Sequence, residues 1–464
     1  MNLKNQSSEA AAAKKSVLIE KIRSEKFFYY FIISIMIIMP VGELITELMG
    51  QTYVSQPHIL SIYGFIGIVT VCLSLLYKYK ENTYYPSDIF YGLLVFFAAM
   101  SLAFSQDIFN SVTGFYYDEL PMHFMAYFSL MYAGTMINDN RLRKNILYVF
   151  CMVAALQCIV AFFQTMGFQI VDCLYDPEWH TEEKLSYGLT HHNNWYAGLS
   201  CIFVAVSTGL FIFTDRNKKI RYVYLALAML SLYTSLSTGA RIALVGNTVT
   251  ILFYIASLII MKFNGYDKKL LKTRTVDFLI AMAAWAVIIA VMAFCTNFFK
   301  RSISEFASES QSGLDQMGTM RGYIWRYGLE SVPKHWLTGV GLDNYIYAFH
   351  ENPSWSEGMF SQAKGHNEYI HTLVTQGVFA AINYIAMLVY AIVTGVKSVI
   401  KNDDESCRCV TWIYLGMFAA YASQAFFNSS VINTAMYFWI VVGLTMPKVS
   451  QKPIKIKSHS SDKN

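Results

Sequence analysis

The sequence predicts an all-α polytopic membrane protein, and three observations lead to this fold class. Of the 464 residues, 55% are hydrophobic and only 14% are charged, whereas soluble domains carry about a quarter charged residues. Long apolar runs recur along the chain, each near the roughly 20 residues that cross a bilayer as a helix. The net charge of +5 is too small for a nucleic-acid footprint, and the high hydrophobicity excludes a disordered chain.

The apolar runs predict about twelve membrane-spanning helices. Their predicted limits are 27–49, 59–77, 87–105, 120–137, 146–166, 193–213, 222–238, 242–261, 276–298, 368–396, 409–426 and 430–446. The first run has no small-residue cleavage site and continues through Pro40 into Glu43 and Glu47. We therefore expect an uncleaved first helix and not a signal peptide.

The Lys and Arg residues in alternate loops predict the orientation. All but eight of the 36 basic residues fall on the side of the N-terminus, and cytoplasmic loops are the ones enriched in Lys and Arg. We expect cytoplasmic basic tails at 1–26 and 447–464, with membrane helices over 27–298 and 368–446. The segment 299–367 is then a large extracytoplasmic loop, and its many aromatic residues favour a packed structure.

The histidines indicate the side on which chemistry would take place. All ten except His459 lie outside or at the outer ends of predicted helices. Histidine often transfers protons near neutral pH, so an active site on this chain would face outward. For each single histidine, a hydrogen-bonding role at the membrane interface is the alternative.

Arg241 stands at the edge of a predicted helix, directly after a Ser-Thr-Gly-Ala turn. A guanidinium group suits forked hydrogen bonding to phosphate, and a Gly-containing turn before a helix offers backbone N–H groups to an anion. Two alternatives stay open for Arg241: an arginine that extends to the interface, or an ion pair with a loop carboxylate.

Spacing separates the remaining candidates. Arg321 and Arg326 are five residues apart, so on a helix at most one of them faces a given ligand, whereas Arg321 and Trp325 share a face. Glu368 and His371 have the spacing of a metal pair, but no further ligands are evident, so we expect no metal site. Gly339 and Gly341 lack the context of a dinucleotide site, and we expect a tight turn there.

Taken together, several segments resemble the O-antigen ligase and polymerase family of bacterial envelope glycan assembly. They are HNNWYAG at 192–198, STGAR at 237–241, RGYIW at 321–325, the run ending in Gly-Val-Gly at 333–341, and HNEYI at 366–370. The resemblance covers roughly residues 150–445 and includes the late, large outer loop. It implies a GT-C-like architecture, the fold of glycosyltransferases that use lipid-linked donors.

The resemblance also implies a reaction. A glycan moves from an undecaprenyl diphosphate carrier to an acceptor on the outer face of the bacterial cytoplasmic membrane. We expect a polymerase of O-antigen or capsular polysaccharide, because nothing marks a dedicated non-glycan acceptor; a ligase is the alternative. The implied partners are the carrier-linked glycan, the lipid bilayer and other envelope polysaccharide assembly proteins, and no metal or other cofactor is implied.

For this reaction we expect Arg241 and Arg321 to stabilise the leaving diphosphate, and His366 to act on the acceptor hydroxyl. Six further residues are expected to bind sugars or shape the site. They are Asn367, Trp325, Tyr323, Arg326, His192 and Asn193.

Two other classes of function remain as rivals. Ion-coupled transporters tend to show repeats, broken helices and charges at the middle of the membrane, whereas the predicted helices here hold few ionisable residues. A non-catalytic scaffold would tolerate the loss of Arg321 and His366.

Overall fold

The structure is a computed structural model that describes residues 24–455 except 52, 54, 82, 115–118, 175–176 and 297. The described chain is almost wholly helical. Its one sheet is an antiparallel pair of two-residue strands, β1 (Thr83–Tyr84) and β2 (Ile454–Lys455). The predicted all-helical class is confirmed, while the basic N-terminal tail lies almost entirely outside the described residues.

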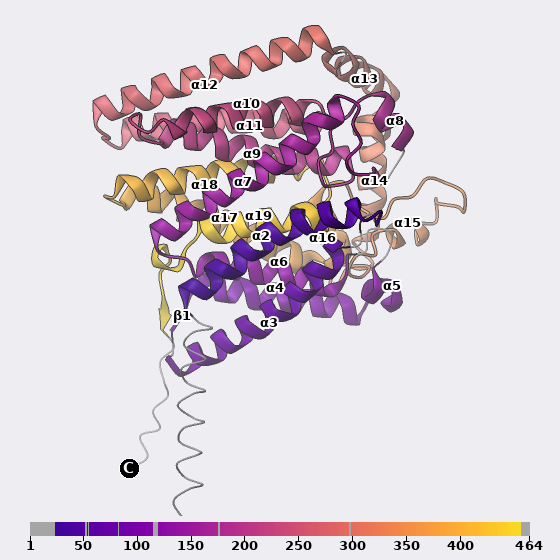
Figure 1. Ribbon diagram of the computed structural model, residues 1–464. Coiled ribbons are helices and arrows are strands. Elements are labelled where there is room, and N and C mark those ends of the chain that lie inside the picture. The colour runs from indigo at the N-terminus through magenta and orange to yellow at the C-terminus, as the bar shows by residue number, and fades with distance from the viewer. Residues whose placement is uncertain are drawn as a thin grey trace, which may run out of the picture.

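Long helices lie side by side and form one bundle (Figure 1). They are α2 (Glu25–Leu48), α3 (Ser55–Glu81), α4 (Pro86–Ala103), α6 (Pro121–Thr135), α7 (Asn140–Thr165), α9 (Asn193–Phe213), α10 (Ile220–Leu236), α11 (Arg241–Phe263), α12 (Lys268–Cys295), α17 (Val378–Lys401), α18 (Glu405–Gln424) and α19 (Ile432–Thr445). The remaining helices complete the described chain. They are α5 (Ile108–Thr113), α8 (Pro177–Glu182), α13 (Phe298–Ser312), η1 (Leu314–Gln316), α14 (Met317–Ser331), α15 (Tyr347–His350), α16 (Glu368–Gln376) and η2 (Lys448–Ser450).

Length and hydropathy qualify eight of the described helices as candidate membrane spans: α2, α3, α4, α7, α9, α11, α12 and α17. Two shorter apolar helices, α10 and α19, accompany them. The chain is therefore a polytopic membrane protein, as predicted. Each of the predicted spans except 368–396 coincides with one helix of the structure, but the count of about twelve crossings stays a prediction.

Helices α9 and α19 lie at the centre of the bundle. All residues of α19 are buried, as are all residues of α9 except Asn194. Helices α6 and α19 approach closely at Gly134 and Gly443, where a Cβ on Gly443 would lie 2.1 Å from the Met131 carbonyl oxygen. Small residues allow such contact between helices in a membrane. Because α19 is enclosed by protein, its 14 residues need not match the thickness of the lipid.

The predicted continuous span at 368–396 is wrong, because the helix breaks into α16 and α17 at Gly377. Gly377 has φ +87°, a left-handed conformation that ends helices and favours glycine. The loop packs into this break: Val378 N–H donates to the Trp336 carbonyl, and a Cβ on Gly377 would lie 2.5 Å from the Leu337 carbonyl oxygen. A distant segment thus imposes the break, which local hydropathy does not reveal.

The two ends of the bundle hold different segments (Figure 1). Strands β1 and β2 lie at one end, and α5, α8, α14 and α15 lie at the other. A chain that crosses a membrane repeatedly places successive loops at opposite ends of its helix bundle, and these segments are separated in this way. The end that faces the cytoplasm remains a prediction from the Lys and Arg residues.

The segment expected as a large loop has a hydrophobic core of its own. Its buried residues are Tyr323, Ile324, Tyr327, Val340, Tyr345, Ala348 and Phe349, joined by Val374 of α16. The expected packing of its aromatic residues is confirmed for these side chains, whereas Trp336 is half exposed. The expected tight turn is also present, with φ +71° at Gly339 and +119° at Gly341.

Candidate functional site

A polar cavity of about 580 Å³ opens at the loop end of the bundle. The starts of α9 and α11, helices α13 and α14, and the loop before α16 supply its walls. Its lining includes Asn193, Arg241, Glu309, Arg321 and His366. The three residues predicted to be catalytic therefore meet at one cavity, although 125 residues of sequence separate the first from the last.

Arg241 is the first residue of α11, and its guanidinium is held by a carboxylate from the loop. Its Nη1 and Nη2 donate to the two carboxylate oxygens of Glu309 at 2.9 and 2.6 Å, and Nη2 also donates to Thr319 Oγ1 at 3.1 Å. These bonds hold the pKa of the Glu309 carboxyl below its usual range. The loop carboxylate named above as an alternative partner for Arg241 is present in this structure.

Glu309 also occupies a turn built to receive an anion. Gly318, Thr319 and Met320 have φ values of +68°, +59° and +66°, so three consecutive residues are left-handed. The N–H groups of Gly318 and Thr319 both point at the Glu309 carboxylate, at 2.9 and 3.1 Å. Converging backbone N–H groups of this kind form anion-binding nests. The carboxylate thus lies where an external anion would find a guanidinium and two amides.

Arg321 is a cation with few partners. Its Nη1 donates to the Gly318 carbonyl at 2.6 Å, and its buried Nε has no hydrogen-bond partner among the described residues. Burial lowers the pKa of Arg321 to about 10, and the nearby charge of Arg241 adds to this effect. A desolvated guanidinium without a carboxylate partner is a ready site for an anion.

His366 faces the same cavity from the loop before α16. Its backbone is left-handed, with φ +45°, and its N–H donates to Ser429 Oγ at 3.2 Å. The ring Nδ1 is buried without a hydrogen-bond partner in the described part of the chain. Burial lowers the pKa of His366 to about 3, helped by the charge of Arg321, so the ring is neutral and able to accept a proton.

A second cavity, of about 460 Å³, adjoins the first and is mostly apolar. Val245, Leu314, Trp325 and Phe427 lie in its wall. Four residues line both cavities: Arg241, Ile242, Glu309 and Arg321. The two arginines therefore mark the boundary between a polar space and an apolar one.

Arg321 and Arg326 lie on different faces of helix α14, as their spacing predicted. Arg321 and Trp325 share the face towards the apolar cavity, and Trp325 Nε1 donates to the Gly365 carbonyl at 3.0 Å. Arg326 points elsewhere: it pairs with Asp315 at 2.8 Å and Glu330 at 3.5 Å, and it lines neither cavity.

The other predicted binding residues divide into one in the cavity wall and three outside it. Asn193 lines the polar cavity, with its Nδ2 donating to the Thr238 carbonyl at 2.9 Å. His192 caps α9 through Nδ1, which accepts from Asn194 N–H, and Asn367 caps α16 through Oδ1. Tyr323 belongs to the hydrophobic core of the loop.

Two features near the site could not be predicted from the sequence. One is Glu309, a polar residue in a charged stretch. The other is a buried contact in which Lys364 Nζ meets the carboxylates of Glu119 and Asp343, all at most 2% exposed on their side chains. Lys364 lies two residues before His366, so this contact fixes the loop to the bundle beside the cavity. The only sequence signal was the scarcity of basic residues expected outside.

Fold and site together define a polytopic helical membrane protein with a cationic boundary between a polar and an apolar cavity. Residues 223–385 match the family model described as O-antigen ligase. This part of the chain is therefore similar to the O-antigen ligase family. The match includes Arg241, Glu309, Arg321 and His366. No curated protein matches the chain.

Proposed function

We propose that the protein is a glycosyltransferase that moves an oligosaccharide from undecaprenyl diphosphate to an acceptor at the outer face of the bacterial cytoplasmic membrane. One observation carries this proposal: two arginines lie where a polar cavity meets an apolar one. A lipid-linked glycan consists of sugars, a diphosphate and an apolar chain, in that order. This order matches the order of the polar cavity, the two arginines and the apolar cavity. The sugars would enter the polar cavity, and the first isoprene units would enter the apolar one.

The diphosphate would lie between Arg241 and Arg321. As the glycosidic bond breaks, negative charge grows on the leaving diphosphate, and cations already fixed at that point lower the barrier. The Gly318 and Thr319 N–H groups would supply further hydrogen bonds. Glu309 must leave this position first, because its carboxylate holds Arg241 and both amides. Binding of the donor therefore requires displacement of Glu309 from Arg241.

His366 would take the proton of the acceptor hydroxyl. That oxygen forms the new bond to the anomeric carbon while the bond from this carbon to the diphosphate breaks, and the diphosphate carrier departs. A histidine with a pKa of about 3 is a weak base. An anion bound to Arg321 would oppose one of the charges that lower this pKa, so donor binding would strengthen the base.

Polymerase and ligase share this donor chemistry and differ in the acceptor. We favour a polymerase of O-antigen or capsular polysaccharide, in which the acceptor is a second carrier-linked glycan. The polar cavity, at about 580 Å³, has room for only a few sugar units in this state. In a deletion strain, lost chain length would identify a polymerase, and intact but unattached polymer would identify a ligase.

Purified protein and a carrier-linked oligosaccharide test the proposal directly. The wild type should release undecaprenyl diphosphate and extend the glycan, whereas Arg241→Ala, Arg321→Ala and His366→Ala should not. Lys334→Ala is a control, because this exposed outer lysine pairs with Glu351 away from the cavities. Carrier release by all three variants at the wild-type rate would reject the assignment. A transporter would release no carrier diphosphate.

A further inference from the structure

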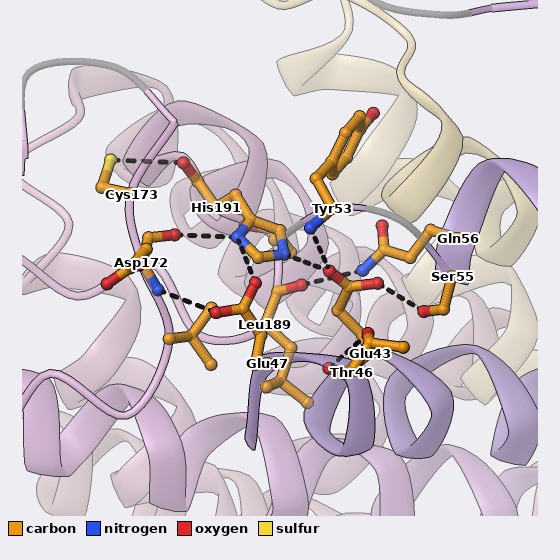
Figure 2. Close-up of polar contacts among 12 residues, drawn as sticks. Glu43, Thr46, Glu47, Tyr53, Ser55, Gln56, Asp172, Cys173, Leu189 and His191 are labelled. Atoms are coloured by element: carbon orange, nitrogen blue, oxygen red, sulfur yellow. Dashed lines mark hydrogen bonds and ion pairs between the residues drawn. The ribbon is translucent and has the colours of Figure 1, made fainter. Parts of the chain in front are cut away.

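A buried acidic cluster joins the end of α2 to the segment before α9 (Figure 2). It consists of Glu43 and Glu47, one helical turn apart on α2, and His191. The side chains of Glu43 and His191 are fully buried, and that of Glu47 is 4% exposed. Each of the three residues offers one atom that could bind a metal ion, and these three atoms lie within 4.8 Å of one another. No other such group of His, Cys, Asp and Glu is found among the described residues.

The hydrogen bonds of His191 fix the state of its ring. Nδ1 lies 2.8 Å from the Asp172 carbonyl oxygen, which can only accept, so Nδ1 carries a hydrogen and donates it. Nε2 then faces Glu43 Oε1 at 2.6 Å (Figure 2). An imidazole lone pair and a carboxylate oxygen repel each other at this distance, so the two atoms must share a cation. A proton fits the distance as it stands, and a metal ion at about 2.0 Å from each atom fits after a small outward shift of the two side chains.

Glu47 distinguishes the two cations. Its Oε2 accepts from Asp172 N–H at 3.2 Å, while its buried Oε1 has no hydrogen-bond partner in the described part of the chain. Oε1 lies 3.8 Å from His191 Nδ1, a contact between charged groups that is too long for a hydrogen bond. A proton shared by His191 and Glu43 joins two atoms and leaves Glu47 Oε1 buried without a hydrogen bond. A metal ion can bind all three groups at once.

We propose that Glu43, Glu47 and His191 bind a divalent transition metal ion, with zinc as the best match. The donor set is one imidazole nitrogen and two carboxylate oxygens, which zinc accepts, whereas magnesium and calcium prefer oxygen alone. Two carboxylates and a neutral imidazole leave two buried negative charges, and a divalent ion balances them.

The residues around the cluster also support a metal site. Metal-bound histidines usually donate their other ring N–H to a carbonyl or carboxylate, as His191 does to Asp172. Glu43 is oriented in turn by Tyr53 N–H at 3.1 Å and by Ser55 Oγ at 2.6 Å. His191 has φ +61°, a conformation that the surrounding structure must hold against local preference.

The metal site would have a structural role: it would hold in place the segment that forms one wall of the polar cavity. His191 precedes His192, the N-cap of α9, and then Asn193, which lines the polar cavity. The ion would therefore tie α2 to this wall across 148 residues of sequence. Its presence does not depend on the reaction proposed above, and no step of that reaction uses it.

Metal analysis of the protein purified without a polyhistidine tag tests the site. We expect one zinc ion per chain by mass spectrometry, and a thermal unfolding midpoint that rises with added zinc and falls with chelator. Glu47→Gln keeps the size of the side chain and an oxygen for Asp172 N–H, so it should fold but bind zinc at least tenfold more weakly. His335→Asn is the matched control, because His335 meets Glu351 at 2.5 Å without a third ligand, and it should bind zinc as the wild type does.

Two results would overturn the proposal. Wild-type protein that binds no zinc when titrated with Zn²⁺ shows that the cluster holds a proton only, and this measurement needs no variant. Equal zinc affinity in Glu47→Gln and the wild type would place the ion elsewhere.

Discussion

Replacing Arg321 by methionine should make the protein more stable and less active. Burial lowers the pKa of Arg321 to about 10, so folding disfavours its charge by about 3 kcal/mol. This cost applies in full at neutral pH, which is below the pKa of Arg321 in both the folded and the unfolded chain. Methionine keeps much of the side-chain volume but loses the bond from the charged guanidinium to the Gly318 carbonyl, worth about 1.5–3 kcal/mol. The net expectation is a gain of up to about 1.5 kcal/mol in the free energy of unfolding.

The effect on turnover should have the opposite sign. Loss of one fixed donor to a developing anion typically lowers the rate by about 10²–10³. Unfolding would be followed in detergent without substrate, and turnover by the release of undecaprenyl diphosphate. Arg326→Met is the matched control on the same helix: its ion pairs are exposed, so stability should change by less than about 1 kcal/mol and turnover should not change. An Arg321→Met protein that is less stable than the wild type, or equally active, refutes the reasoning.

Three further predictions follow from the site. Glu309→Gln removes the internal anion from Arg241, so the KM for the donor should fall by about tenfold in steady-state assays, and an increase would contradict the displacement of Glu309. The pKa values of His192 and His366 are both lowered to about 3 by burial, so the unfolded chain binds more protons between pH 6.5 and 3. Stability should therefore fall as pH falls through this window, and His366→Asn should reduce the slope of the unfolding midpoint against pH. Lys364→Met leaves two buried carboxylates without their cation and should destabilise the protein by about 3–5 kcal/mol in denaturant titrations, whereas an unchanged midpoint would show that the contact is not formed.

Hydropathy was sufficient for the helices that face lipid, because each long apolar run must satisfy its backbone within itself. The same physics explains where the prediction failed. The break at Gly377 depends on Trp336 and Leu337, which lie some 40 residues earlier and fill the gap in the helix. Local composition contains no trace of that contact.

The candidate site shows a similar division. Arg241, Arg321 and His366 could be selected by residue type and sidedness, and the structure brings them to one cavity. Their hydrogen-bond partners could not be predicted, because residues that meet across distant segments have no characteristic separation in the sequence. Glu309 reads as one acid among several. The acidic pair on α2 was visible at helical spacing, but its histidine is 148 residues away.

The position of α19 has a consequence for biogenesis. This last helix is wholly buried and contacts α6 through Gly134 and Gly443, so it fills the middle of a bundle whose other members are all synthesised earlier. The core cannot close before α19 has been synthesised, so α6 must wait in the membrane with its glycine surface uncovered. A chain truncated before Ile432 would lack the centre of the bundle and not its edge.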